Sequence, residues 1–174
     1  MKTKLLIIFI LFGCKSIAQT SLHKKIKPTL SVSISGLIAK STTFGIKELE
    51  KLASEKIPDV IIYNAEGVAK DTLTNMKGIT LKTLLSPIKY NYKNKHELNE
   101  FYFTLIASDG YKVVFSWNEI YNTPCGNQFY IVTEMDGKKI DKIRQRILFI
   151  STADLKTNRR YIKGLEKIEV KKTN

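Results

Sequence analysis

The chain has 174 residues, with 29 lysines and arginines against 16 aspartates and glutamates, and a formal net charge of +13. Its length matches one domain with a real core, and its charge favours anionic partners such as phosphates, acidic polymers or a negative membrane surface. Because it has only two cysteines and two histidines, CxxC metal or redox sites are excluded, and a zinc site or Ser-His-Asp triad built on His23 and His96 is disfavoured.

Residues 1–18 have the pattern of a signal peptide. Two lysines precede an apolar run from Leu5 to Phe12, and small residues follow. The run is shorter than the roughly 20 apolar residues that a permanent membrane-spanning helix needs. The tripeptide at 16–18 resembles an A-x-A cleavage site, which predicts a soluble exported protein, periplasmic or secreted.

A second interpretation of the same segment is a lipid anchor. The tetrapeptide that ends at Cys14 resembles a bacterial lipobox, in which this cysteine would become the lipid-bearing first residue. If residues 1–18 are removed, Cys125 is the only cysteine of the mature chain, so an intramolecular disulfide is excluded. Residues 19–29 are then expected to form a short arm before the domain.

The first elements predicted are a strand, a helix and another strand. Residues 29–38 alternate apolar and serine side chains, which is the period of a strand with one buried face. Thr42 or Thr43 is expected to cap a short helix whose apolar stripe runs from Ile46 to Ala53, and which ends before Pro58. The apolar run 60–62 predicts the next strand.

A polar cluster and a short helix follow that strand. Residues 63–67 are polar and end in glycine, and residues 77–85 are interpreted as a turn, a cap at Thr80 and a short apolar helix that ends at Pro87. Residues 89–100, rich in asparagine and lysine, predict a surface loop.

A hairpin and a capped helix are predicted next. The aromatic and branched residues 101–107 form a strand, the turn chemistry at 108–110 reverses the chain, and 111–115 returns as its partner. Ser116 and Glu119 have the spacing of a capping box at the start of a helix.

The remaining elements are strands. They are predicted at 128–133, before the Asp136-Gly137 turn, at 146–151 and at 161–170. Short strands outnumber short helices and do not alternate with long ones, so the fold class is α+β, a compact mixed β-rich domain with short helices. Four core contacts are expected in the last segment: Ile162, Leu165, Ile168 and Val170.

The order of these elements is similar to the oxidoreductase molybdopterin-binding domain of the sulfite oxidase family. The similarity covers about residues 30–170, which leaves a basic tail at 171–174. Its best parts are Asp109-Gly110-Tyr111 with the helix that follows, and the run from Arg160 to Lys163 before the last strand. The resemblance implies a domain that binds a pyranopterin whose dithiolene holds molybdenum, with a protein cysteine as a further metal ligand.

The chain departs from that family at the metal. The position where the family has its cysteine is occupied by Asn64, whose neutral amide cannot replace a soft thiolate. The family's upstream segment, which brings a substrate-binding arginine, has no counterpart between Gln19 and Leu30. Cys125 lies in a different loop.

The resemblance leaves four candidate residues for binding a pterin-like or phosphate-bearing ligand: Asn64, Tyr111, Arg160 and Lys163. Guanidinium and ammonium groups suit phosphate as bidentate and point-charge donors. Structural interpretations stay open for each: an Asx turn at Asn64, cross-strand packing at Tyr111, and a solvated turn and strand end for Arg160 and Lys163 together with Arg159.

Three hypotheses follow. The first is an exported, non-catalytic molybdopterin-domain-like protein that binds a small anionic or pterin-like ligand, without protein thiolate ligation, or acts as a scaffold. The alternative is a molybdenum-cofactor-dependent oxidoreductase, its cofactor held by Tyr111, Arg160 and Lys163 and its metal bound without a thiolate or through Cys125. In the third, the basic surface attaches to an acidic envelope component or membrane surface. Nucleic acid is not expected as a partner.

Overall fold

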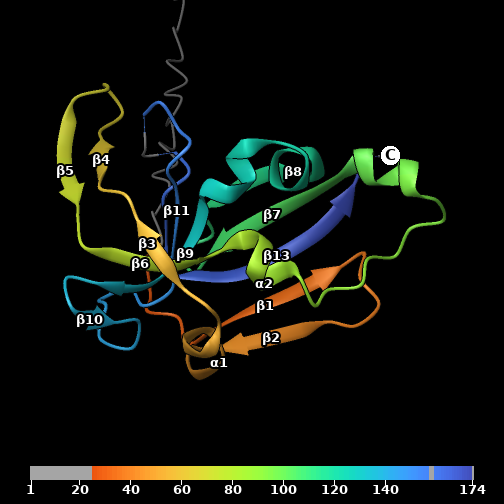
Figure 1. Ribbon diagram of the computed structural model, residues 1–174, viewed down its shortest axis with the longest axis horizontal. Coiled ribbons are helices and arrows are strands. Elements are labelled where there is room, and N and C mark those ends of the chain that lie inside the picture. Colours follow the sequence, from red (N-terminus) through yellow and green to blue (C-terminus); the bar gives the residue numbers. More distant parts are fainter. Residues whose placement is uncertain (1–24, 157–158, 174) are drawn as a thin grey trace, which may run out of the picture.

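Five strands form the first sheet of the computed structural model, which describes residues 25–156 and 159–173. The strand order is β2-β1-β13-β7-β8, as Figure 1 shows. β1 and β13 pair in parallel, with Ile34 opposite Ile168, whereas the other neighbours are antiparallel. The strands are β1 (Ser31–Gly36), β2 (Thr42–Gly45), β7 (Phe101–Ala107), β8 (Lys112–Ser116) and β13 (Leu165–Lys172).

The predicted signal peptide at 1–18, Cys14 of the lipobox and His23 lie outside the described residues. Among the residues that are described, no helix has the length and apolar character needed to cross a membrane. The arm that precedes β1 docks through Ser108, whose hydroxyl accepts from the backbone N–H of Lys27 at 2.9 Å and donates to its carbonyl oxygen at 2.8 Å.

The second sheet has the order β12-β11-β9-β6-β3, and β10 pairs with β9 beside this path. All its neighbouring strands run antiparallel. The predicted turn at Asp136-Gly137 is confirmed, since both residues have positive φ (50° and 72°) between β9 and β10. The strands are β3 (Glu55–Ile57), β6 (Met76–Thr80), β9 (Phe129–Met135), β10 (Lys138–Lys139), β11 (Leu148–Ser151) and β12 (Ile162–Lys163).

A separate hairpin stands beside the two sheets, at the left of Figure 1. It consists of β4 (Val60–Tyr63), which confirms the predicted strand, and β5 (Ala69–Leu73). β5 was not predicted because its residues 69–72 are exposed and have no apolar alternation. The polar cluster at 63–67 is therefore the tip of a hairpin.

In the described part of the chain five short helices connect the strands: α1 (Ile46–Lys51), α2 (Leu81–Leu85), α3 (Trp117–Tyr121) and the 3₁₀ helices η1 (Lys95–Glu100) and η2 (Pro124–Gln128). The Thr80 cap is confirmed, because its hydroxyl accepts from the N–H of Thr83 at 3.1 Å. The capping box is confirmed as well: Ser116 accepts from the N–H of Glu119 at 3.1 Å, and Glu119 accepts from the N–H of Ser116 at 2.9 Å.

Several local predictions were wrong. Thr42 and Thr43 lie in β2, paired with β1, and α1 begins after Gly45 without a side-chain cap. Residues 55–57 and 77–80 are strand instead of helix end and turn, because both pair in the second sheet. The surface loop at 89–100 contains η1. At residues 42–45, 55–57 and 77–80, pairing with another strand outweighs a local preference.

The main core lies between the two sheets. It includes phenylalanines from both, and the rings of Phe115 and Phe129 have centroids 4.7 Å apart. The four core contacts predicted in the last segment are confirmed, each with 0% of its surface exposed. A smaller cluster, with Val60 and Ile143, covers the other face of the second sheet. The predicted class, a β-rich α+β domain with short helices, is confirmed.

Candidate functional site

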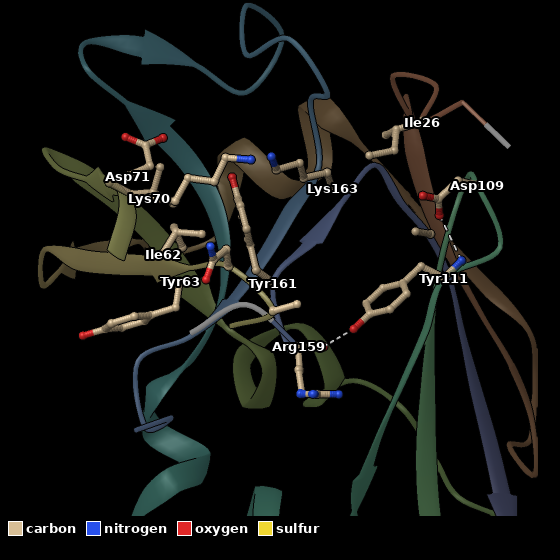
Figure 2. A pocket seen from close by; sticks show the side chains of 14 residues that line it. Ile26, Ile62, Tyr63, Lys70, Asp71, Asp109, Tyr111, Arg159, Tyr161 and Lys163 are labelled. Atoms are coloured by element: carbon tan, nitrogen blue, oxygen red, sulfur yellow. Dashed lines mark hydrogen bonds between the residues drawn. The ribbon is translucent and has the colours of Figure 1, made fainter. Parts of the chain in front are cut away.

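A pocket of about 740 Å³ lies between the β4–β5 hairpin, the β7–β8 turn and the segment that leads into β12 (Figure 2). Three segments distant in sequence therefore form its walls. Its polar lining has three cations, three tyrosines and two carboxylates: Lys70, Arg159 and Lys163; Tyr63, Tyr111 and Tyr161; Asp71 and Asp109. Asn64 also lines it, together with Ile26, Ile62, Ala65, Leu73 and Ala107.

The structure brings three of the four predicted site residues together. Asn64, Tyr111 and Lys163 line the pocket, although they come from the hairpin tip, the β7–β8 turn and β12. Arg160 is not among the lining residues, whereas its neighbour Arg159 is. The pocket also has Lys70 and Tyr161, for which sequence reasoning gave no binding role. Lys70 lies on the unpredicted β5, so only the pairing of that strand with β4 could have located it.

Tyr111 connects two walls of the pocket. Its backbone N–H donates to Asp109 Oδ1 at 2.9 Å, which closes the turn, and its hydroxyl donates to the carbonyl oxygen of Arg159 at 2.5 Å (Figure 2). The side chain is 44% exposed, so it is not a cross-strand packing residue of the core. Tyr111 therefore fixes the segment that carries Arg159 against the β7–β8 turn.

Asn64 organises the hairpin tip. Its side-chain Oδ1 accepts from the backbone N–H of Val68 at 2.8 Å, and its own backbone N–H donates to the Val68 carbonyl oxygen at 2.9 Å. Its carbonyl oxygen accepts from the N–H of Gly67 at 3.1 Å. The turn-forming interpretation of Asn64 is thus supported by its contacts, and the residue still faces the pocket.

Lys70, Lys163 and Tyr161 point their polar ends toward the same end of the pocket in Figure 2. The Lys163 ammonium lies 5.0 Å from the centre of the Tyr161 ring, within the range of a cation–π contact. Burial, with a smaller contribution from the charge of Asp71, raises the pKa of Tyr161 to about 12. The hydroxyl therefore remains a neutral hydrogen-bond donor beside two ammonium groups at physiological pH.

Arg160 points away from the pocket into a network with two carboxylates. Its Nε donates to Asp154 Oδ2 at 3.0 Å, its Nη1 donates to Glu119 Oε1 at 3.0 Å, and its Nη2 also bonds Asp154. The guanidinium lies 4.9 Å from the ring centre of Phe115 and 5.3 Å from that of Phe129. Burial acts to lower the pKa of Arg160, but the two carboxylates outweigh it and raise that pKa. The solvated-turn interpretation of Arg160 is therefore wrong.

The lining does not fit a metal held by a protein thiolate. No cysteine or histidine is among the lining residues, and Cys125, in η2, is half-buried against the main core. Within residues 25–156 and 159–173, no group of three or more His, Cys, Asp and Glu side chains could hold a metal ion. The cations and tyrosines do fit the anionic and planar parts of a pterin-like molecule.

The fold is similar to that of a solved structure, the sulfane dehydrogenase SoxCD from Paracoccus pantotrophus. The TM-score is 0.56 at 10% sequence identity, and the match covers 80% of this chain and 37% of that chain. The chain thus spans little more than a third of the dehydrogenase chain's length. No protein-family profile matches the sequence, and no curated protein matches it. The likeness supports the sulfite oxidase-type fold that the element order predicts, and at this identity it concerns the fold alone.

Proposed function

We propose that this protein is an exported, non-catalytic binding module whose pocket takes a small anionic, pterin-like ligand. The observation that carries the proposal is that cations from two distant segments, Lys70 of β5 and Arg159 and Lys163 of the segment 159–163, line one 740 Å³ pocket that has no thiol among its described lining residues. A volume of this size suits a compact organic ligand.

The two ammonium groups give the ligand its orientation. Lys70 and Lys163 repel each other without a ligand, and a carboxylate or phosphate between them converts this repulsion into two charge-assisted hydrogen bonds. The neutral hydroxyl of Tyr161 supplies a third donor at the same end. Asp71 and Asp109 limit the net charge of the lining, so the proposal concerns an anion of low charge, and not a polyanion.

Fluorescence titration with pterin-6-carboxylate tests the proposal, with neutral pterin as the matched ligand. We expect saturable binding of the carboxylate, competition by inorganic phosphate, and weaker binding of the neutral pterin. Lys70→Gln and Lys163→Gln should each weaken binding about tenfold or more, since a hydrogen bond to a charged group contributes about 1.5–3 kcal/mol. Lys112→Gln, which removes an exposed lysine of β8 outside the lining, is the matched control and should leave binding unchanged.

Equal affinity for neutral and carboxylated pterin would overturn the proposal, and so would the same loss in Lys112→Gln as in Lys163→Gln. If neither pterin nor phosphate binds to the folded protein, the ligand-binding function is wrong and a scaffold role remains, to be tested by identifying a stoichiometric protein partner.

A molybdenum-cofactor-dependent oxidoreductase is the second candidate, favoured by the fold likeness to a sulfane dehydrogenase. Two contacts count against the ligand set expected for it. Cys125 packs on the core away from the lining, and Arg160 is committed to Asp154 and Glu119. Elemental analysis for molybdenum, with fluorescence detection of released pterin, on protein purified from its native host decides between the two. Stoichiometric molybdenum would establish the enzyme, whereas pterin without metal would support the binding module.

A further inference from the structure

We propose that residues 138–146 form a docking surface for an anionic phospholipid membrane, separate from the pocket. This basic segment begins at β10, at the lower left of Figure 1, and includes five cations against the single carboxylate of Asp141. The cations are Lys138, Lys139, Lys142, Arg144 and Arg146. The proposal does not depend on the pocket having a ligand.

Two buried isoleucines hold the basic segment in place. Ile140 and Ile143 are 0% and 4% exposed, and they pack in the two hydrophobic clusters on opposite faces of the second sheet. The backbone N–H of Ile140 donates to the Thr133 carbonyl oxygen at 2.8 Å, and that of Arg146 donates to the Ile143 carbonyl oxygen at 3.0 Å. Because the apolar side chains point inward and the backbone is fixed, the lysines at 138, 139 and 142 and Arg144 are exposed.

The positive charge of the basic segment is mostly not neutralised. Some lysines elsewhere have glutamate partners, such as Lys77 with Glu134 at 3.1 Å and Lys172 with Glu97 at 3.0 Å. In the basic segment only Lys142 has a carboxylate partner, Asp141, at 3.3 Å. Among the described residues, no other ion pair includes a residue of the basic segment. Four of the five cations of residues 138–146 therefore have no carboxylate ion-paired to them among the described residues.

The surroundings favour a membrane surface over an enclosed ligand or a nucleic acid. None of the five cations lines the pocket or the two smaller hollows of about 300 Å³. The segment has no aromatic residue, the stacking group that single-stranded nucleic acid binding uses. Thr29 bridges to Arg146, and Leu30 beside it is 63% exposed. Dispersed cations with an exposed leucine match an array of anionic headgroups over an apolar layer.

Co-sedimentation with phosphatidylglycerol and phosphatidylcholine vesicles tests this proposal. The test variant is Lys138→Gln/Lys139→Gln/Arg144→Gln. The control, Lys89→Gln/Lys93→Gln/Lys95→Gln, removes the same charge from exposed positions at the start of η1 and in the segment before it. We expect the test variant to lose roughly 100-fold in affinity for anionic vesicles, at about fivefold per cation, and the control to lose much less.

Added salt should weaken binding of the wild type, and phosphatidylcholine vesicles should not bind it. Unfolding curves of both variants check that each is folded. Equal losses of vesicle affinity in the two variants would show that only the net charge of the protein matters, and this would overturn the proposal. The absence of wild-type binding to anionic vesicles would also overturn it. Stronger binding to heparin than to vesicles would also overturn it, in favour of an acidic polymer. A pterin titration that is unchanged in the test variant separates this surface from the pocket.

Discussion

The hydroxyl of Tyr111 donates a hydrogen bond of 2.5 Å to the backbone carbonyl oxygen of Arg159, 48 residues further along the chain. It joins the β7–β8 turn to the segment that leads into β12, which are two walls of the pocket. On its other side the same segment is held by Arg160, through Glu119 and Asp154. The position of Arg159 in the pocket thus depends on contacts on both sides of the chain.

Tyr111→Phe removes the bond to Arg159 and keeps the ring. We expect a loss of about 0.5–1.5 kcal/mol in the free energy of unfolding, toward the lower value because the side chain is 44% exposed and water replaces part of the bond. Urea unfolding measures this loss. Tyr92→Phe is the matched control, since Tyr92 is 42% exposed and its hydroxyl has no hydrogen bond among the described residues. An equal loss in both variants would contradict the role given to Tyr111.

Arg160→Lys should lower the free energy of unfolding much more than Arg159→Lys does. The guanidinium of Arg160 bonds Asp154 and Glu119 together and lies over two phenylalanine rings, a geometry that an ammonium group cannot reproduce. The side chain of Arg160 is 26% exposed and that of Asp154 is 11% exposed. Water can therefore replace little of the hydrogen bonding that the substitution removes. We expect a loss of about 2–3 kcal/mol in the free energy of unfolding.

The adjacent Arg159 gives the control for this substitution, because its backbone carbonyl oxygen accepts the hydrogen bond from Tyr111, and a change of its side chain leaves that bond in place. A double-mutant cycle of Arg160→Lys with Asp154→Asn should show a coupling free energy of about 1 kcal/mol or more. Additive effects in that cycle, or equal losses at positions 159 and 160, would show that the network is not what stabilises the segment.

The elements that the sequence predicts well are those whose signal is local. The strand at 101–107 agrees with β7 residue for residue, because aromatic and branched side chains fill it and the Asp109-Gly110 turn ends it. The caps at Thr80 and Ser116 were also predictable, since a capping hydroxyl and its amide lie three residues apart.

The pocket was only partly predictable, because its walls are formed by long-range pairing. The family resemblance located Asn64, Tyr111 and Lys163 in one place, as the lining has them. It could not locate Lys70, whose strand has no apolar period and exists through its pairing with β4. It also gave Arg160 the role of a ligand-binding residue, because nothing in the sequence indicates that Glu119 and Asp154 meet that side chain.

Glu169 makes a contribution to the free energy of unfolding that changes with pH in the acid range. Hydrogen bonds from Lys167 and then Lys171 lower the pKa of its carboxyl from 4.5 to about 2. Because the folded-state pKa lies below the unfolded one, the stabilisation is present above pH 4.5 and is lost as the pH falls toward 2. The pairs lie at the surface, so we expect less than about 1 kcal/mol.

Urea unfolding of the wild type and Glu169→Gln, from about pH 5 down to pH 2, measures this term. The difference between the two should shrink as the pH falls, and in about 0.5 M salt it should be small at every pH. Glu50→Gln removes an exposed glutamate that has no ion pair in the described part of the chain, and it should show no such trend. A difference that is constant with pH would contradict the assignment to Glu169.

Gly126 is required by the close approach of η2 to α3, and we expect Gly126→Ala to be the most destabilising substitution considered. A Cβ atom at this position would lie 1.8 Å from the carbonyl oxygen of Ile120 and 2.6 Å from its carbonyl carbon, so backbone would have to move. We expect a loss of about 3 kcal/mol or more in the free energy of unfolding. Gly137→Ala is the matched control, because Gly137 has a φ of +72° but nothing within 4 Å, which leaves a conformational cost of about 1 kcal/mol. If Gly126→Ala unfolds at the same urea concentration as Gly137→Ala, the two helices are not in the close contact described.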